Sequence, residues 1–404
     1  MILAALVSVF QGCKNAVIFS QDFQWDAARA LLFRINPYLQ SLEPGIIDEP
    51  GIIEYRRYFD SIGAPQRMEA NQFPSLLWLL SPLAAQPFHL ARYIWTAMNL
   101  GLSLASGFLF WRCFAKKAAI GSSCFCLLFT LAGTPWRNQV GVGQHTIFSC
   151  CFFLLAVWIS EKWGNSQDLD SYLSEERDFA ALSAKDLFAG LALSISYFKY
   201  TLTAPLALWF IYKRRWKVFF VSLLPHAALN LFSCYWLNMS LSDVIVLPLR
   251  VSSKLASEGG IDVGAMLGGG FFSVLMSAVF LVFCLGLVFK LPQGLDSELF
   301  GLLLLFSLVM VYHRTYDFFV LIFVLPGLCR LMSLENSSKI AGRISFFHYG
   351  ILLVFAFFGL RLFHESEGAL IVLAVLYYGF TAIYSLYMVS RIKKPNSEGL
   401  IHEK

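Results

Sequence analysis

Long continuous apolar runs fill most of the chain, and short polar loops separate them. The runs do not alternate with a period of two, which favours helices over the strands of a membrane barrel. A helix needs about 20 apolar residues to cross a bilayer, where every backbone amide must be hydrogen-bonded internally. The pattern therefore predicts an all-α, polytopic transmembrane helix bundle with roughly a dozen spans. The expected spans are residues 2–19, 92–111, 118–134, 143–160, 186–198, 201–213, 217–236, 265–289, 298–311, 317–333, 344–361 and 369–390.

Two segments near the N-terminus do not fit a span. Residues 20–73 are polar and broken by Pro and Gly, and we interpret them as a large first extracytoplasmic loop. Residues 74–87 are apolar but short, so a re-entrant or interfacial hairpin is favoured over a short second span. With the loop included, residues 1–404 are expected to form a single integral membrane domain.

Composition supports the membrane class. Hydrophobic residues make up 57% of the chain and charged residues only 14%, against about 25% charged residues in a soluble domain. The cysteines lie mostly in or beside apolar runs and show no zinc-site spacing, so we expect small buried side chains, no metal and no cofactor. The modest net charge of +5 comes from basic residues in short loops, which argues against a nucleic-acid partner.

Lysine and arginine in short loops predict the orientation of the bundle. When the spans are counted with residues 74–87 as non-spanning, most basic loops and both termini are expected in the cytoplasm. Residues 20–73 are then expected outside. Arg250 and Lys254 fall outside as well, so the rule acts here as a bias. The basic loop residues that carry the argument are Arg112, Lys116, Lys117, Lys213, Arg214, Arg215, Lys217, Arg343, Arg391, Lys393 and Lys394.

Ionisable residues in or beside a span are candidates for function, because burying a charge in a membrane is costly. Asp22 follows the first expected span and precedes an amphipathic helix expected over residues 27–33. Composition alone favours Asp22 as the cap of that helix over Asp22 as a functional acid. For Arg314 and Asp317, a helix-end ion pair and a functional site are equally favoured.

The chain also shows an ordered series of short motifs between residues 22 and 205. This series resembles glycosyltransferase family 87, whose members are polyprenyl-phosphate-mannose-dependent mannosyltransferases of the GT-C fold. Phe33-Arg34 replaces the small residue usual in the family, and the C-terminal third resembles the family only in hydropathy. The matching motifs are Asp22-Phe23, the Ala/Leu-rich stretch 27–32, Asn36-Pro37-Tyr38, Phe73-Pro74 to Pro82, Ala91 with Trp95 and Asn99, Gly143-Gln144-His145-Thr146, and Lys199 with Pro205.

The resemblance implies a hexosyltransferase that moves a hexose, most often mannose, from a polyprenyl-phosphate carrier to a glycolipid or other glycan acceptor. It implies a site that faces outside the cytoplasm, in a cell membrane of the bacterial inner-membrane type, with Asp22 as general base and Asp26 beside it. A single base without a covalent nucleophile implies inversion. The remaining candidates are Lys199, His313, Arg314 and Arg137 for the donor phosphate, and Gln144, His145 and Glu54 for the acceptor and sugar.

Alternatives stay open for several of these residues. Asp22 and Asp26 with Glu54 could hold a divalent cation, but a metal-free site is favoured because no full oxygen cage is visible. Arg137 could be an interfacial anchor, and His145 could simply hydrogen-bond at a helix start. For the whole protein, the alternative function is a transporter or lipid flippase, which would need ionisable residues along a path through broken helices.

Overall fold

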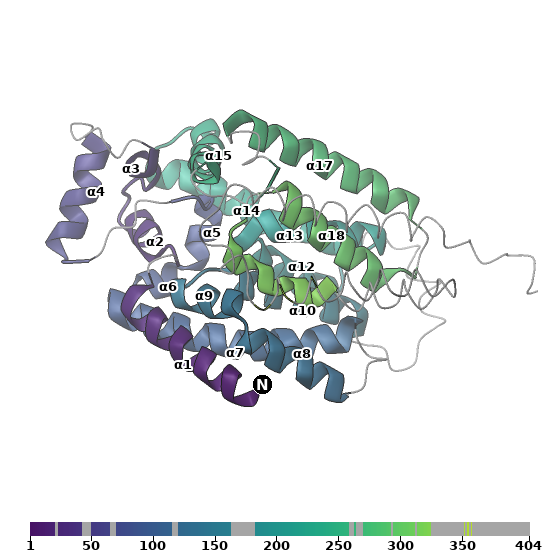
Figure 1. The fold of residues 1–404 in the computed structure, drawn as a ribbon. Helices are drawn as coiled ribbons and strands as arrows, with labels where there is room; N and C mark the ends of the chain where they lie inside the picture. Colours follow the sequence, from purple (N-terminus) through teal and green to yellow (C-terminus); the bar gives the residue numbers. More distant parts are fainter. Residues whose placement is uncertain are drawn as a thin grey trace, which may run out of the picture.

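The computed structural model describes residues 1–20, 23–42, 50–64, 70–114, 120–162, 182–257, 262–263, 270–291, 294–311, 313–324, 351, 354 and 357 (Figure 1). Every element in this part of the chain is helical. The N-terminal half holds α1 (Ile2–Phe19), α2 (Trp25–Leu32), α3 (Tyr38–Leu42), α4 (Pro50–Ser61), α5 (Pro74–Leu79), α6 (Ser81–Ala84), α7 (Phe88–Phe114), α8 (Ile120–Ala132), α9 (Thr134–Val142) and α10 (Thr146–Lys162). The remainder holds α12 (Ala184–Ser196), η1 (Tyr197–Lys199), α13 (Tyr200–Tyr212), α14 (Trp216–Leu237), α15 (Leu241–Ser257), α17 (Gly270–Lys290), α18 (Asp296–Met310) and η2 (Thr315–Val324).

The apolar runs up to residue 311 form helices close to their expected limits. By length and composition, α7 and α14 could each cross a membrane, and α9 with α10 forms a pair bent by 103° that is either a broken span or a re-entrant loop. The described residues thus show two to three candidate spans, and the dozen expected from hydropathy remain a prediction. The expected spans at 344–361 and 369–390 lie outside the described residues, apart from three single positions.

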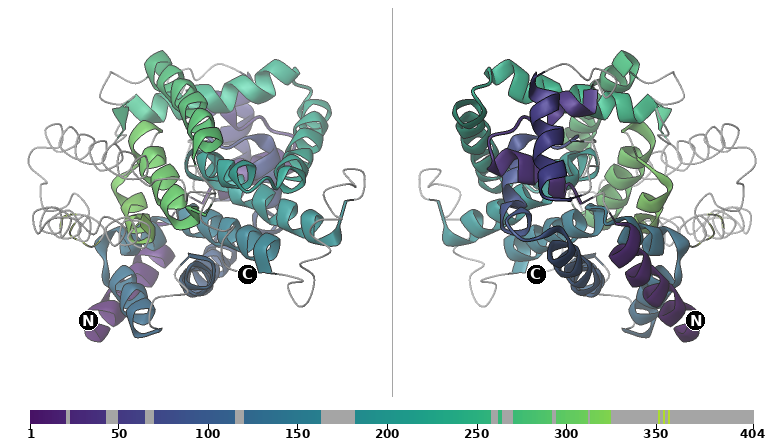
Figure 2. Two further views of the ribbon diagram at one scale, coloured as in Figure 1. Left: turned by 90° about the vertical axis from the view of Figure 1, so that its right-hand side faces the viewer. Right: turned by 90° about the vertical axis from the view of Figure 1, so that its left-hand side faces the viewer.

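The helices surround α10, which packs against α7 on one side and α12 on the other. In turn, α12 packs on α14, while α1 runs beside α9 (Figures 1 and 2). Large apolar side chains fill the space between them, and Trp95, Trp136, Trp209, Phe153 and Phe210 are almost wholly buried. Since lipid can also solvate apolar residues, close packing of such side chains is what ties these helices to one another.

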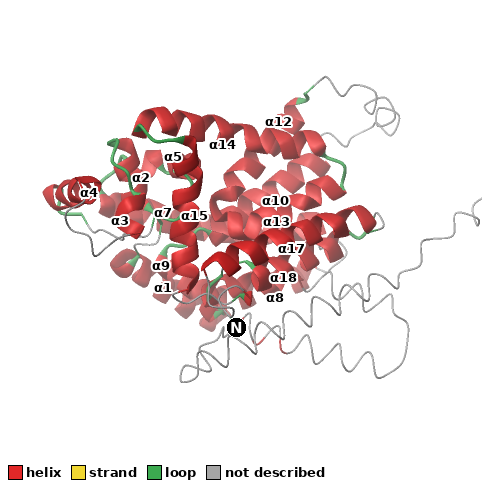
Figure 3. Cartoon of the chain, turned by 90° about the horizontal axis from the view of Figure 1, so that it is seen from above, coloured by secondary structure: helices red, strands yellow, loops and turns green. Residues whose placement is uncertain are grey.

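The first polar loop folds into the short helices α2, α3 and α4, which gather at one end of the bundle (Figures 1 and 3). One basic residue, Arg29, joins three of the elements at this end. Its Nη1 donates to the carbonyls of Ala84 and Ala85 at the end of α6, at 2.8 and 3.0 Å, and its Nε donates to the Tyr58 hydroxyl of α4 at 3.0 Å. These charge-assisted bonds position α2 against α4 and the end of α6.

Residues 74–87 form two short helices, α5 and α6, of six and four residues. At 1.5 Å per residue, neither approaches the thickness of a bilayer. The polar partners of α5 lie on α14: the Ser75 amide donates to Asn230 at 3.0 Å, and the Trp78 indole donates to Ser233 at 2.9 Å. The position of this segment within the membrane remains a prediction.

Two helices lie between the expected spans. Residues 135–142 fall almost wholly within α9, and residues 237–264 contain α15. Helix α9 is short and scarcely apolar on average, and α15 carries Asp243, Arg250 and Lys254 among its apolar residues. A search for long apolar runs passes over such helices, because only one face of each is buried.

Candidate functional site

A break between α12 and α13 places Lys199 inside the protein. Lys199 is only 7% exposed, and its backbone leaves the helical region at φ −112° and ψ 67°. Neighbouring hydroxyl groups bond the peptide groups at this break: the Lys199 amide donates to Ser149 Oγ at 2.7 Å, and Thr203 Oγ1 donates to the carbonyls of Ser196 and Lys199 at 2.8 and 3.1 Å. These hydrogen bonds hold the backbone of the lysine in a defined position.

A second break, between α9 and α10, forms a corner beside this lysine. Gly143 has a φ of +78°, and a Cβ at this position would come within 2.1 Å of Ser20 Oγ. Ser20 Oγ donates to the Val142 carbonyl at 3.1 Å, and the Trp95 indole donates to the Gly143 carbonyl at 2.8 Å. A left-handed residue without a side chain is required here, because the end of α1 and α7 both close on the corner.

The corner carries His145 and Thr146 into the interior, where both are buried. The His145 ring hydrogen-bonds the backbone of Phe23, and Lys199 and Asp317 are close enough to act on it electrostatically. Its Nε2 has no hydrogen-bond partner among the described residues. This imidazole nitrogen can therefore meet a polar group of a ligand.

The third part of the site is the start of η2. His313 and Asp317 are both wholly buried there, and His313 Nδ1 lies 3.1 Å from Asp317 Oδ2. The other ring nitrogen of His313 lies 3.3 Å from Ser307 Oγ on α18. The Ser307 hydroxyl itself donates to the Thr201 carbonyl at 2.8 Å. Ser307 thus links the His313 ring to the start of α13.

The Asp317 carboxylate joins the three parts. Its Oδ1 accepts from Thr146 Oγ1, and its Oδ2 lies 3.4 Å from Lys199 Nζ. Oδ2 also faces His313 Nδ1 and accepts from the Arg314 amide at 3.3 Å. The residues Thr146, Lys199, His313 and Asp317, which we call the buried polar cluster, thus come from α10, η1 and the segment that opens η2.

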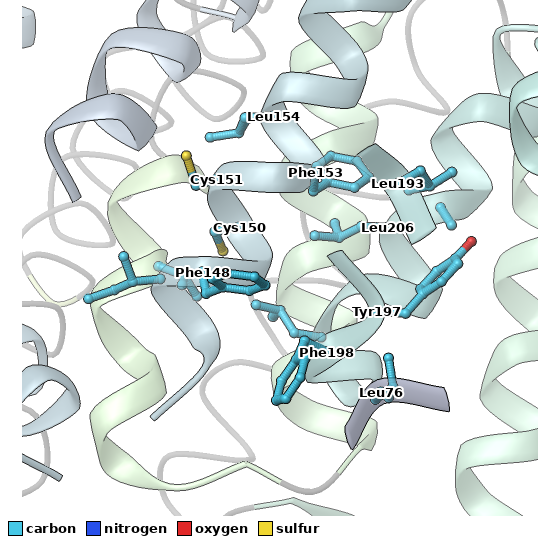
Figure 4. Close-up of a cluster of buried hydrophobic side chains, with 14 of the residues drawn as sticks. Leu76, Phe148, Cys150, Cys151, Phe153, Leu154, Leu193, Tyr197, Phe198 and Leu206 are labelled. Atoms are coloured by element: carbon cyan, nitrogen blue, oxygen red, sulfur yellow. The ribbon is translucent and has the colours of Figure 1, made fainter. Parts of the chain in front are cut away.

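Close to Thr146 and Lys199 in the chain, aromatic and aliphatic side chains such as Phe148 and Phe198 form a buried hydrophobic cluster (Figure 4). The Phe198 ring lies 4.3 Å from the His145 ring and 5.8 Å from the Phe148 ring, measured between centroids. Phe198, Leu206 and Leu193 are all essentially unexposed. Electrostatic interactions are stronger in such surroundings than in water, so the charges of the buried polar cluster depend on one another.

The first loop approaches the same corner. Phe23 stacks on Trp95 with 6.1 Å between ring centroids, and Trp95 in turn contacts His145. Asp22, the predicted base, lies outside the described residues. The N-cap of α2 is Gln24, so the interpretation of Asp22 as the cap of this helix is wrong. The capping pattern misled because the turn at Phe23 and Gln24 delays the start of the helix until Trp25.

Asp26 sits in the first turn of α2, where its carboxylate joins α2 to α4. Oδ1 accepts from the Ala27 amide at 2.9 Å, and Oδ2 accepts from the Tyr55 hydroxyl at 3.0 Å. Burial, and next the nearby Asp26 charge, hold the pKa of the Tyr55 hydroxyl well above its ordinary value. Tyr55 therefore remains a neutral donor to a carboxylate that is only 5% exposed.

The other predicted site residues lie further from the buried polar cluster or on its edge. Arg137 lies on the side of α9 that faces α1, where its guanidinium donates to Gln11 at 2.6 Å. Glu54 is exposed on α4, away from the buried Asp26 carboxylate. Gln144 and Arg314 are half-buried, next to His145 and His313 in the chain. Among the described residues, no group of three His, Cys, Asp or Glu side chains could hold a metal ion.

Sequence reasoning did not identify the role of Asp317. It weighed a functional site and a helix-end pair with Arg314 equally for Asp317, whereas the carboxylate contacts Lys199 and His313 and accepts from the backbone amide of Arg314. An acid within a few residues of His313 and at the start of an apolar run was the available signal. Its partner Lys199 is too distant in sequence for periodicity to indicate the contact.

Comparison with known protein families matches residues 74–313 to the model of glycosyltransferase family 87. The match covers more than half of the chain, and it includes Thr146, Lys199 and His313 of the buried polar cluster. Comparison with curated proteins and with solved structures finds no match.

Proposed function

The chain belongs to glycosyltransferase family 87, and from this premise we propose that it moves a hexose from a polyprenyl-phosphate carrier to an acceptor outside the cytoplasm. Family membership makes the protein a membrane glycosyltransferase and replaces the transporter or flippase alternative. The lipid carrier, mannose as the sugar, and the acceptor, a glycolipid or another glycan, are the proposal. The single observation that carries the proposal is the buried Lys199 ammonium, which lies beside Asp317 in the buried polar cluster.

Two groups of this cluster approach the same carboxylate oxygen. The Lys199 ammonium lies 3.4 Å from Asp317 Oδ2, and His313 Nδ1 lies 3.1 Å from it. An ammonium on a side chain that is only 7% exposed is costly to bury unless anions face it. The phosphate of a sugar donor is such an anion, and charge-assisted bonds from lysine are suited to it.

The same charges serve the chemistry of transfer. When the bond between sugar and phosphate breaks, negative charge grows on the departing phosphate oxygen, and cations fixed in advance stabilise it. The ammonium of Lys199 has three hydrogens, so its contact with Asp317 leaves donors for the phosphate. His145, with its Nε2 unpartnered within the described part of the chain, is proposed to meet a sugar or acceptor hydroxyl.

The acceptor hydroxyl needs a general base, for which we propose Asp22. The described residues on either side of it both contact the α9–α10 corner: Ser20 through the Val142 carbonyl, and Phe23 through the ring of His145. Ser20 and Phe23, the described residues that flank Asp22 in the chain, thus both lie at the corner that carries Thr146 of the buried polar cluster. Asp26 suits the role less well, since its two oxygens already accept from Ala27 and Tyr55.

Donor choice tests the proposal. The purified protein would be reconstituted into liposomes containing extracted glycolipids, and supplied either with radiolabelled polyprenyl-phosphate mannose or with nucleotide-linked mannose. We expect label to appear in glycolipid or glycan from the polyprenyl donor alone. Transfer from the nucleotide sugar, with none from the polyprenyl donor, would refute the lipid-carrier proposal and leave the family assignment in place.

A further inference from the structure

Asp317 has more polar contacts than any other side chain of the buried polar cluster. Thr146 Oγ1 donates to its Oδ1, while Lys199 Nζ, His313 Nδ1 and the Arg314 amide approach its Oδ2 at 3.4, 3.1 and 3.3 Å. The contacts come from three segments that are far apart in the chain. Asp317 is wholly buried, so water does not compete for these contacts.

These contacts exclude Asp317 from the role of general base. A carboxylate has about four lone-pair positions, and the Asp317 carboxylate has four donors around it. A base must approach the acceptor hydroxyl within about 3 Å and take up its proton. The donors around Asp317 fill its accepting positions and stabilise its ionised form, which makes it a poor acceptor for a further proton.

The contacts instead determine the positions of the Lys199 and His313 side chains. Lys199 has a long and flexible side chain, and its ammonium is restrained by Asp317 and by the Tyr316 ring, whose centroid is 5.8 Å away. The same carboxylate orients the His313 ring by accepting a hydrogen bond from its Nδ1. We infer that Asp317 is a positioning residue, which holds Lys199 and His313 in place for the phosphate of the sugar donor without touching the donor.

This inference rests on the proposed donor site, and it makes a separate prediction for Asp317→Asn. The amide keeps the shape of the side chain, but an NH₂ group replaces one oxygen. In either orientation of the amide, this group would face a donor, so part of the anchoring is lost. We expect kcat/KM for the polyprenyl-phosphate donor to fall by about 10–100-fold, the range found when a partner that orients a ligand-binding group is removed.

The experiment measures Asp317→Asn and Lys199→Met, singly and together, in the full chain reconstituted with radiolabelled polyprenyl-phosphate mannose. Asp317→Asn should raise the KM for the donor and leave the KM for the acceptor unchanged, which a general loosening of the fold would not do. If Asp317 acts through Lys199, its effect should shrink when Lys199 is already replaced.

Asp296→Asn is the matched control. Among the described residues, Asp296 forms a second lysine–aspartate pair, with Lys213 at 3.2 Å, at the far end of α18 from the buried polar cluster. Its replacement should leave the KM for the donor unchanged. Thermal unfolding of each variant verifies that it is folded.

The outcomes separate the two proposals. If Lys199→Met weakens use of the donor but Asp317→Asn retains wild-type kcat/KM, the positioning role is refuted while the donor site stands. An equal loss from Asp317→Asn with or without Lys199, or a rise in both KM values, also refutes it. If Lys199→Met itself transfers sugar at the wild-type rate and donor KM, the proposed donor site fails.

Discussion

At the scale of single residues, hydrogen-bond partners determine which acids of the first loop are available as a general base. The family resemblance gave Asp22 as the general base with Asp26 beside it, but only the structure shows that the Asp26 carboxylate joins α2 to α4. Hydrogen bonds across 29 residues, such as the one from Tyr55, leave no pattern in the sequence. The residue types of the site could therefore be predicted, but their division between structural and chemical roles could not.

Replacing Tyr55 by Phe tests the structural role of Asp26. The change leaves Asp26 Oδ2 without its Tyr55 donor in a buried position, so the free energy of unfolding should fall by about 1–3 kcal/mol. Thermal or denaturant unfolding of the purified protein measures this. Tyr235, which is 81% exposed, provides the control, because Tyr235→Phe should change stability by less than about 0.5 kcal/mol. Equal stability of both variants would contradict the role given to the Asp26–Tyr55 contact.

At the scale of elements, hydropathy predicted most helices but not the breaks between them. The helices α1, α7, α10 and α14 lie close to their predicted limits, since burial in lipid or core requires the apolar length that the sequence displays. At the breaks near Gly143 and Lys199, some peptide groups have no partner within a helix. Hydroxyl groups of Ser20, Ser149 and Thr203 bond these peptide groups instead. The site residues His145, Thr146 and Lys199 lie at these breaks. The site was therefore less predictable from the sequence than the helices around it.

The Gly143→Ala variant tests the α9–α10 corner. A side chain at φ +78° costs about 1–2 kcal/mol, and its overlap with Ser20 Oγ adds to that cost. We expect a loss of stability above about 2 kcal/mol and reduced transfer, because the corner carries His145 and Thr146. Gly101 lies within α7, and a Cβ there would meet nothing within 4 Å, so Gly101→Ala should be neutral or slightly stabilising. If the two variants behave alike in unfolding, the tight corner is not what holds this part of the bundle.

At the scale of the whole molecule, the sequence predicted an all-helical membrane protein, and every secondary-structure element among the described residues is helical. Family membership confirms the membrane glycosyltransferase. The sidedness remains a prediction, because orientation depends on Lys and Arg in loops relative to a membrane, and packing within the protein does not reveal it.

Labelling of introduced cysteines tests that sidedness. Gly45→Cys in the first loop and Ser397→Cys near the C-terminus would be made in a chain whose native cysteines are first blocked. An impermeant thiol reagent should label Gly45→Cys from outside the cell and Ser397→Cys only after the membrane is opened. Labelling of both positions from the same side would overturn the predicted topology.

The most direct measurement of the central claim is sugar transfer from polyprenyl-phosphate mannose by the Asp22→Asn variant. Asparagine keeps the shape of the side chain but cannot take up the proton of the acceptor hydroxyl, so kcat should fall by about 10²–10⁴-fold while the protein remains folded. Asp26→Asn, measured beside it, should retain more activity. Transfer by well-folded Asp22→Asn at near the wild-type rate would contradict the account and move the search for the base to Asp26 and then Glu54.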